Sequence, residues 1–426
     1  MLPTPKKSFL VCFFLTLALF APAKEEKNAE DKNKHKHGIK NRTFEISLAN
    51  VSVAVSNDFV TAKDFFQETF VVNLDDFLNG FKFDFGAAIK PISLNFNWKD
   101  KWGFGFDFGH INVFGNLSLS RNMLNFETVE NDTFGMGAAA FVDLLAVPVF
   151  FHVGDLKVKI RPSVYLPLLY TEPGITYSFN GERLSIDYDM RVYTLINLNG
   201  IQDFGDSDSP IHDELHTGTI WRILENNLGY DVSLGLEYNL SSWVDIGVDI
   251  FNIPLPFLAP KLNNYMRLQD SVYVDTGKID LGELIDGGSI PEDAYHYPEE
   301  FEPEYGYDSD GKVLYRPFTA LFYANCRPFD SYVFTLIPSV GLSYNRLYPN
   351  RFAPEGGLGI RLDLGNIFIT TVGVNYTDRK WKNSVDFVLN FRVIELDIGV
   401  SVQSPNFVKS FQGAGVGVNV GVKIGF

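Results

Sequence analysis

The chain has 426 residues and a formal net charge of −16, and this acidity argues against nucleic acid as a partner. Hydrophobic residues make up 46% of it, a composition that fits neither a disordered chain nor a helical membrane protein. Aromatic residues are the outlier, with 39 Phe and 19 Tyr, and they suit either a Phe-rich β core or a protein bordered by lipid interfaces.

Residues 1–23 have the features of a secretory signal peptide. Lys6 and Lys7 precede an apolar run from Phe9 to Phe20, and Ala21-Pro22-Ala23 follows as an Ala-x-Ala exit. The run is too short to cross a bilayer as a helix, and no later run reaches the roughly 18 to 20 unbroken apolar residues that a membrane helix needs. Cleavage after residue 23 leaves Cys326 as the only cysteine, so we expect an exported chain without an internal disulfide.

The next segment, residues 24–42, is expected to be a flexible, charged periplasmic arm, because it has almost no apolar side chains to bury. His35 and His37 lie among lysines there, but a solvated charge run is the commoner explanation, and we expect no metal. Residues 43–80 are expected to form either a first strand or an N-terminal plug.

From Thr43 onward the chain repeats about ten residues of alternation followed by a break, a pattern that predicts β-strands, and residues 81–426 are predicted to form a barrel. The clearest example is Leu228–Leu240, in which apolar side chains occupy one face while Asp231 and Glu237 lie on the other. Carboxylates are costly inside a sandwich core, whereas a water-filled lumen solvates them and lipid meets the opposite face. The sequence therefore predicts an all-β protein, a transmembrane antiparallel β-barrel.

Short and long breaks alternate along the chain, as expected for short periplasmic turns and long extracellular loops. Candidate strands start near residues 43, 81, 103, 134, 155, 174, 184, 228, 243, 313, 331, 355, 366, 383, 393 and 413. The segment near residue 174 is short, and the first candidate has the plug as its alternative. We therefore expect about 14 strands, within a range of 12 to 16.

Two insertions, residues 199–227 and 253–312, are predicted to be large outer loops. Loops of this length usually gate a pore, cap it or bind a partner. Their apolar side chains make them the candidate surface for capturing a ligand: Ile220, Trp221, Leu224, Leu255, Phe257, Leu258 and Leu262.

Charged side chains on the polar faces of the strands predict a ladder within the lumen. Its members are Lys157, Lys159, Arg161, Asp231, Glu237, Arg361, Asp363, Asp386, Arg392, Glu395 and Asp397. Two interpretations stay open: ion pairs that stiffen the wall, and a constriction that selects the charge of the permeant solute.

No motif predicts catalysis. His212-Asp-Glu-Leu-His216 has the histidine spacing of a zinc protease helix, but Asp213 replaces the glutamate that would act as base, and no clear third ligand follows. We expect no catalytic residues, no metal site and no cofactor, and the chain is interpreted as a non-enzyme.

The C-terminal segment Gly413–Phe426 alternates without interruption and ends on an aromatic residue. Valines share one face with Ile424 and Phe426, and glycines with Asn419 and Lys423 share the other. This segment resembles the closing strand of bacterial outer-membrane β-barrels. By that resemblance Val422, Ile424 and Phe426 are the assembly signal, which the barrel-assembly machinery would recognise.

The signal peptide, the alternating strands, the long loops and the terminal Phe426 together resemble an outer-membrane channel. The length, the Phe content and the proline-broken Asn252–Pro260 segment resemble the FadL-type long-chain fatty-acid transporters, although the Asn-Pro-Ala signature of their N-terminal hatch is absent. The resemblance implies a fourteen-stranded barrel in the bacterial outer membrane that captures a hydrophobic ligand among its outer loops and releases it sideways through the wall.

We expect a passive importer of small hydrophobic molecules whose partners are outer-membrane lipid, the assembly machinery and the ligand, with no nucleic acid. Two alternatives stay open. One is a general porin for polar solutes, and the other is a surface adhesin that displays acidic loops.

Overall fold

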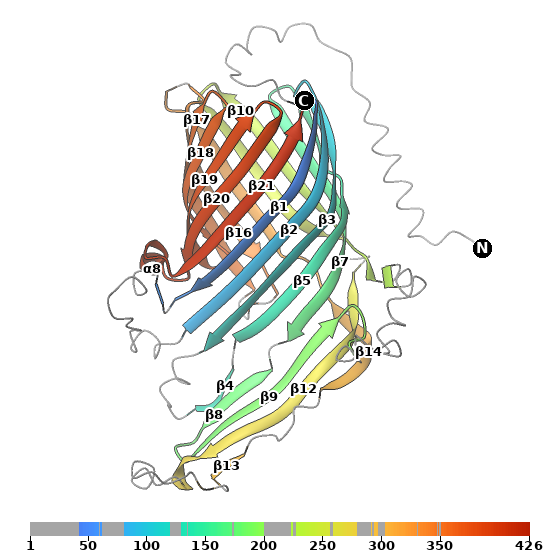
Figure 1. Cartoon of the computed structure of the whole chain (residues 1–426), viewed down its shortest axis with the longest axis vertical. Coiled ribbons are helices and arrows are strands. Elements are labelled where there is room, and N and C mark those ends of the chain that lie inside the picture. Colours follow the sequence, from blue (N-terminus) through green and yellow to red (C-terminus); the bar gives the residue numbers. More distant parts are fainter. Residues whose placement is uncertain are drawn as a thin grey trace, which may run out of the picture. The chain divides into compact units, whose positions relative to one another are not determined.

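A computed structural model describes the chain from Arg42 to Phe426 with gaps (Figure 1). The described residues are 42–58, 60–61, 81–119, 129–133, 135–172, 174–199, 223–224, 227–255, 259–278, 291, 294–296, 303–329, 331–346, 348 and 351–426. The predicted signal peptide and the arm up to residue 41 lie outside this part of the chain.

The wall of a barrel is formed by strands that pair in antiparallel fashion with their neighbours around a ring. In ring order they are β1 (Phe44–Asn57), β2 (Phe81–Trp98), β3 (Trp102–Leu119), β5 (Gly135–Ala146) with β6 (Val149–Val153), β7 (Leu156–Glu172), β10 (Gly229–Ser241), β11 (Val244–Pro254), β15 (Phe318–Cys326), β16 (Phe334–Tyr344), β17 (Phe352–Leu364), β18 (Phe368–Thr377), β19 (Lys380–Phe391), β20 (Ile394–Ser404) and β21 (Gly415–Gly425). Pairing of β1 with β21 closes the ring.

The described residues thus form a closed barrel of 14 strands, because β5 and β6 share one position in the wall on either side of Val147-Pro148. Fold class and the central estimate of the strand number are confirmed. Residues 43–80 are predicted to form either a first strand or an N-terminal plug, and residues 44–57 of this segment lie in the wall as β1. Residues 62–80 of that segment are outside the described part of the chain.

A second group of strands continues one side of the barrel as a sheet beyond the wall. It contains β4 (Val129–Thr133), β8 (Ile175–Phe179), β9 (Arg183–Thr194), β12 (Lys261–Asp275), β13 (Tyr295–His296) and β14 (Glu304–Val313), and Thr276–Lys278 form a 3-10 turn, η3. The sheet is joined to the wall where β9 pairs with the end of β7. We call it the outer sheet, and the end of the barrel that carries it the outer end.

This sheet explains where the sixteen candidate strands differ from the fourteen of the wall. The candidates near residues 174 and 184 are β8 and β9, which pair within the outer sheet. The insertion 253–312, predicted to be a loop, contributes β12 and most of β14. Alternation reveals that a strand has two faces, but it does not reveal the sheet to which the strand belongs.

The two faces of the wall differ in chemistry, as predicted. In β21 the outward side chains Val416, Val418 and Val420 are each 44–45% exposed, whereas the inward Gly417 and Gly421 are buried. Exposed apolar side chains continue this pattern around the wall, among them Val53, Phe85, Phe108, Leu236, Phe322, Val340, Leu358, Val372, Phe387 and Val400. An outward apolar band around a closed barrel is the surface that faces lipid in a transmembrane protein.

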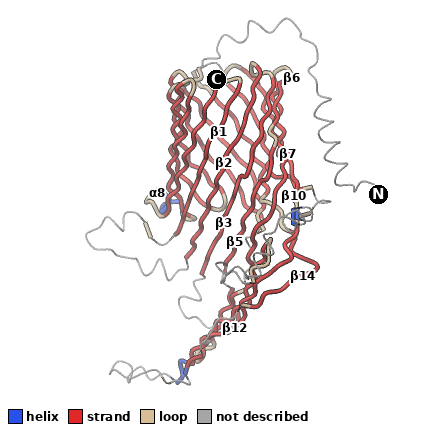
Figure 2. The backbone as a smooth tube through the Cα atoms, turned by 45° about the vertical axis from the view of Figure 1, so that its right-hand side comes forward, coloured by secondary structure: helices blue, strands red, loops and turns tan. Residues whose placement is uncertain are grey.

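Short turns join the strands at the end opposite the outer sheet, which we call the periplasmic end (Figure 2). There the chain ends of the barrel meet: the Phe44 and Phe426 rings lie 5.8 Å apart, and the Phe426 N–H donates to the Phe44 carbonyl at 3.0 Å. At the outer end a short helix, α8 (Phe407–Phe411), lies between β20 and β21. None of the helices in the described part of the chain is long and apolar enough to cross a membrane.

Candidate functional site in the barrel lumen

Three cations of β7 line the lumen, where their neighbours are acidic. The register of β7 and β10 sets Glu237 opposite Lys157, and the Lys159 Nζ lies 3.4 Å from Glu237. Arg161 lies one step nearer the outer end and bridges Asp107 at 3.3 Å and Asp143 at 3.4 Å. Lys159 and Arg161 thus contact carboxylates of neighbouring strands, while the Lys157 Nζ lies 5.2 Å from the centre of the Phe150 ring.

A second set of predicted ladder residues lies on β19, β20 and β21. The Lys423 Nζ contacts Glu395 at 2.6 Å and Asp397 at 2.9 Å, so one lysine neutralises two carboxylates. Asp386 lies on the inner face of β19, between the exposed Val385 and Phe387. Arg392 is the exception in the predicted ladder, because it lies in the exposed turn between β19 and β20 with a left-handed φ of 66°.

Arg42 completes this second set, although the sequence analysis placed it in the arm. Its guanidinium donates to Glu45 at 3.0 Å, to Glu395 at 3.3 Å and to Asn390 at 2.8 Å. Its Nε also donates to the Arg392 carbonyl at 3.2 Å. The residue that precedes β1 is therefore tied to β19 and β20 across the seam of the barrel.

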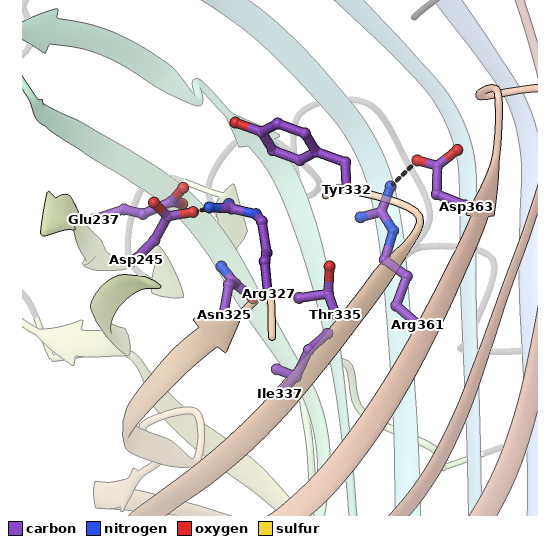
Figure 3. A pocket seen from close by; sticks show the side chains of 9 residues that line it. All are labelled: Glu237, Asp245, Asn325, Arg327, Tyr332, Thr335, Ile337, Arg361 and Asp363. Carbon is purple, nitrogen blue, oxygen red and sulfur yellow. Dashed lines mark hydrogen bonds and ion pairs between the residues drawn. The ribbon is translucent and has the colours of Figure 1, made fainter. Parts of the chain in front are cut away.

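The periplasmic end of the lumen contains a polar pocket of about 210 Å³ (Figure 3). Arg327 forms an ion pair with Asp245 and lies with its guanidinium carbon 4.4 Å from the centre of the Tyr332 ring. On the opposite side of the pocket Arg361 contacts Asp363 at 3.3 Å. The predicted pair Arg361 and Asp363 therefore lies together here, in a lumen lined by charge.

Arg316 lies at the centre of a buried ionic cluster that the sequence analysis did not single out. Its Nε donates to Asp231 at 2.7 Å, its Nη2 donates to Ser163 at 2.6 Å, and it also pairs with Asp143. The guanidinium lies 4.7 Å from the centre of the Tyr165 ring. Asp143 is fully buried and Asp231 is 2% exposed, so Arg316 compensates two carboxylates that have almost no access to water.

These contacts form one continuous chain of alternating charge. Lys90 contacts Asp107 at 2.7 Å, and Arg161 joins Asp107 to Asp143, which pairs with Arg316. The chain runs along the inner face of the wall from β2 to β10, and the His110 ring adds a nitrogen 3.4 Å from Asp143. We call it the charge chain.

An apolar cluster lies beside Arg316 at the outer end of the lumen. Its buried members are Ala139, Phe141, Tyr165, Tyr170, Tyr193, Leu262 and Leu314, and Phe114, Leu195, Tyr265 and Tyr348 pack against them. The Phe141 ring lies 5.9 Å from Phe114 and 6.0 Å from Tyr165. We call this group the aromatic cluster. Its side chains come from the wall, from the outer sheet and from the connections between strands.

The predicted capture residues are only partly described. Leu262 is fully buried in the aromatic cluster, while Leu224 and Leu255 are half-buried. Ile220, Trp221, Phe257 and Leu258 lie outside the described residues. The signal that located Leu262 was its place in an insertion rich in apolar residues. Phe141, Tyr165 and Tyr170 were missed because they occupy wall strands, where an aromatic residue also suits the lipid face.

Three cations border the aromatic cluster on the outer side. Lys312 pairs with Glu172, and its Nζ lies 5.5 Å from the centre of the Tyr170 ring. Arg346 donates to the Val313 carbonyl at 3.0 Å. The pKa of Lys312 is lowered by burial and by the positive charges of Arg346 and Arg351.

Tyr348 caps this arrangement. It belongs to the connection between β16 and β17, yet its hydroxyl lies 3.5 Å from Asp84 of β2, half-way round the ring. The Arg379 guanidinium lies 4.1 Å from the centre of its ring. Tyr348 therefore links the connection that follows β16 to β2 at the outer end of the lumen.

Comparison with known proteins gives only distant structural likeness. No family model matches the chain, and no curated protein matches it. Among solved structures, the toluene transporter TbuX of Ralstonia pickettii has 10% identity and a TM-score of 0.44, over 93% of this chain and 92% of that chain. The monoaromatic hydrocarbon channel CymD has 10% identity and a TM-score of 0.43, over 90% and 89%. The toluene transporter TodX of Pseudomonas putida has 10% identity and a TM-score of 0.40, over 89% and 88%. The fold described above rests on the chain's own strand pairing.

Proposed function

We propose that the protein is an outer-membrane importer that takes up small hydrophobic molecules by passive diffusion. The observation that carries the proposal is the aromatic cluster, which places buried apolar side chains at the outer end of a lumen that is otherwise charged. An apolar molecule gains about 25 cal/mol for each Å² of surface that it removes from water. The cluster is therefore where such a molecule would be captured.

The cations beside the cluster favour a hydrophobic molecule with an acidic head, such as a long-chain fatty acid. Lys312 lies against the Tyr170 ring, and Arg346 and Arg351 are close enough to lower its pKa. An alkyl chain packed on the cluster would leave its carboxylate within reach of these side chains. Charge-assisted hydrogen bonds are about twice as strong as neutral ones.

Below the cluster, the lumen is lined by the charge chain and by other paired charged side chains. Because this lining is unfavourable for an apolar molecule, it favours an exit through the wall. The ladder between β2 and β3 pairs Ile89 with Ile111 and resumes at Ile92 and Phe108, so it omits Pro91, which has no N–H to donate. Gly109, opposite this break, has a left-handed φ of 64°. A weak point in the wall at the level of the charge chain suits the sideways release that the family resemblance implies.

The proposal is tested with the refolded protein in vesicles and in planar bilayers. Oleate should bind saturably, and Arg346→Ala with Arg351→Ala should weaken that binding by roughly 10- to 100-fold, the equivalent of about 1.5–3 kcal/mol for charge-assisted contacts. The same pair should leave the binding of toluene, which has no charge, unchanged. Tyr170→Ala should weaken the binding of both probes, and the lipid-facing Val418→Ala is the matched control.

Two results would contradict the proposal. A steady ohmic current without added oleate would support a porin for polar solutes. If the barrel is folded but passes no current and binds neither probe, it is not an importer. The adhesin that displays the outer sheet would then be the remaining alternative.

A further inference from the structure

We propose that α8 is an interfacial helix that inserts its apolar face into the outer leaflet of the membrane, at the boundary between headgroups and acyl chains. The inference goes beyond import, because it assigns a lipid-binding role to a segment outside the wall. It holds whatever the barrel transports.

The helix exposes the side chains that would normally be buried. Phe407 is 47% exposed, Val408 is 61% exposed and Phe411 is 56% exposed. The Phe407 ring packs edge-on against Trp381 at 4.7 Å and against Phe411 at 5.2 Å. These four side chains form a single apolar surface beside the wall, which we call the α8 patch.

The polar groups of the helix point toward the barrel and hold it in this orientation. Ser410 is fully buried, and its hydroxyl accepts a hydrogen bond from Asn383 of β19 at 3.0 Å. The Lys409 Nζ donates to the Asp58 carbonyl at 2.6 Å. Asn406 caps the first turn by accepting from the Val408 and Lys409 amides at 2.9 and 3.2 Å. With its polar side chains engaged, the helix presents only its apolar side outward.

The occupant of the α8 patch follows from its continuity with the lipid-facing band. Asn383 and Trp381 lie on the same face of β19 as the outward Val385 and Phe387. The strands that flank the helix expose Val400 of β20 and Val416 of β21. The patch is therefore the outer margin of the band that already faces acyl chains, and Asn383, the polar side chain between Trp381 and Val385 on this face, is engaged by Ser410 of the helix.

The composition of the patch suits the membrane interface. Aromatic rings collect at the headgroup level of transmembrane barrels, and Tyr376, 5.1 Å from Trp381, extends this aromatic group along β18. An amphipathic helix in the interface plane buries its apolar face by about 5–10 Å. The helix would also shield the side chain of Asn383, a polar group on the lipid side of the wall, from the acyl chains.

Site-directed spin labelling tests the inference in the protein that lacks the predicted signal peptide, residues 1–23, and therefore lacks Cys12. The nitroxide is attached to Val408→Cys in a Cys326→Ser background, and the protein is refolded into vesicles of phosphatidylethanolamine and phosphatidylglycerol. Labels at Val400→Cys, in the lipid-facing band, and at Gln269→Cys, exposed on the outer sheet, provide the two references.

The Val408 label should be more accessible to oxygen than to a water-soluble nickel chelate, as at Val400, and it should be shallower than Val400. The double substitution Phe407→Ser with Phe411→Ser should shift the accessibility of the Val408 label toward that of the Gln269 label. The heat-modifiable migration of the protein on a gel should show that the barrel is still folded. Equal access to both agents in the parent protein would place α8 in water and overturn the inference. Protection from both agents would mean that protein covers the patch, and this would also overturn it.

Discussion

At the residue scale, Arg316 compensates two buried carboxylates at the outer end of the lumen. It is 8% exposed and compensates Asp143 and Asp231, which are almost completely buried. Removing one partner of a buried ion pair typically costs about 3–5 kcal/mol, because the remaining charge is stranded in a low dielectric. Arg316→Met should therefore lower the free energy of unfolding, measured by urea titration in vesicles, by about that amount.

The control for this prediction removes the stranded charge as well. Arg316→Met combined with Asp143→Asn and Asp231→Asn leaves no unpaired ion, so it should recover much of the lost stability. If Arg316→Met alone were as stable as the parent protein, the cluster would not be needed to keep these carboxylates ionised.

The pair between Asp189 and Arg267 in the outer sheet predicts a dependence on pH. Arg267 holds the Asp189 carboxylate with hydrogen bonds of 2.6 and 2.8 Å, and this lowers the pKa of Asp189. A lowered pKa means that the pair stabilises the fold above the ordinary pKa of aspartate, about 3.9, and that this contribution is lost as the pH falls through the lower folded value.

The difference in melting temperature between the parent protein and Asp189→Asn should therefore be present at pH 7 and should vanish at the acid end of the titration. It should also shrink in high salt, because both side chains are partly exposed. A difference that persists unchanged through pH 3 and in high salt would show that the carboxylate charge is not what stabilises the sheet.

At the scale of elements, alternation in the sequence predicts the wall well and the outer sheet poorly. The C-terminal segment ending in Phe426 was assigned to its two faces correctly, because lipid outside and water inside impose a strict period of two. In β12 the order Asn263, Asn264, Tyr265, Met266 alternates weakly. The sequence therefore predicts a loop for the insertion that contains this strand.

The candidate site was less accessible to sequence reasoning than the wall. The strand faces predict lumen positions for Asp231 and Arg161, but Arg316, which pairs with Asp231, lies between β14 and β15 in a segment without alternation. Tyr348 was missed for a similar reason, because its contact with Asp84 joins residues 264 positions apart. Contacts made across a lumen leave no periodic signal along the chain.

Arg42 stabilises the seam between β1 and β21. Arg42 bridges Glu45 to Glu395 and to the β19–β20 turn, so it ties the lumen side of the seam, while the Phe44 and Phe426 rings contact each other on the other side. Loss of hydrogen bonds to charged groups costs about 1.5–3 kcal/mol. Arg42→Ala should therefore lower the temperature at which the barrel loses its fast-migrating form on a semi-native gel.

Arg392→Ala is the matched control for the seam, because Arg42 contacts only the carbonyl of Arg392 and the side chain is exposed. It should leave the transition temperature unchanged. Equal transition temperatures for Arg42→Ala and the parent protein would mean that the strand pairing alone holds the seam.

At the scale of the whole molecule, Tyr348 links distant parts of the barrel at its outer end, and we expect it to act as a cap. Tyr348 follows β16, its hydroxyl lies 3.5 Å from Asp84 on the far side of the ring, and the Arg379 guanidinium lies 4.1 Å from the centre of its ring. Both side chains of the cation–π contact are half-buried, so this contact contributes between about 0.5 and 2 kcal/mol, and a hydrogen bond contributes about 0.5–1.5 kcal/mol. We expect a cap held by these contacts to open for a ligand.

Single-channel recording in planar bilayers separates a cap from a static part of the wall. The parent protein should show little current, and Tyr348→Ala should show frequent or steady openings, because it loses the stacking and the contact with Asp84 together. Tyr348→Phe keeps the stacking and loses only the hydroxyl contact, so its openings should be intermediate in frequency.

Tyr332→Ala is the control, because it removes a comparable stacking contact with Arg327 at the periplasmic end. It should leave the recording unchanged if closure lies at the outer end. Increased current in Tyr332→Ala but not in Tyr348→Ala would move the barrier to the periplasmic pocket, where the paired Arg327 and Asp245 would then be the groups that close the lumen.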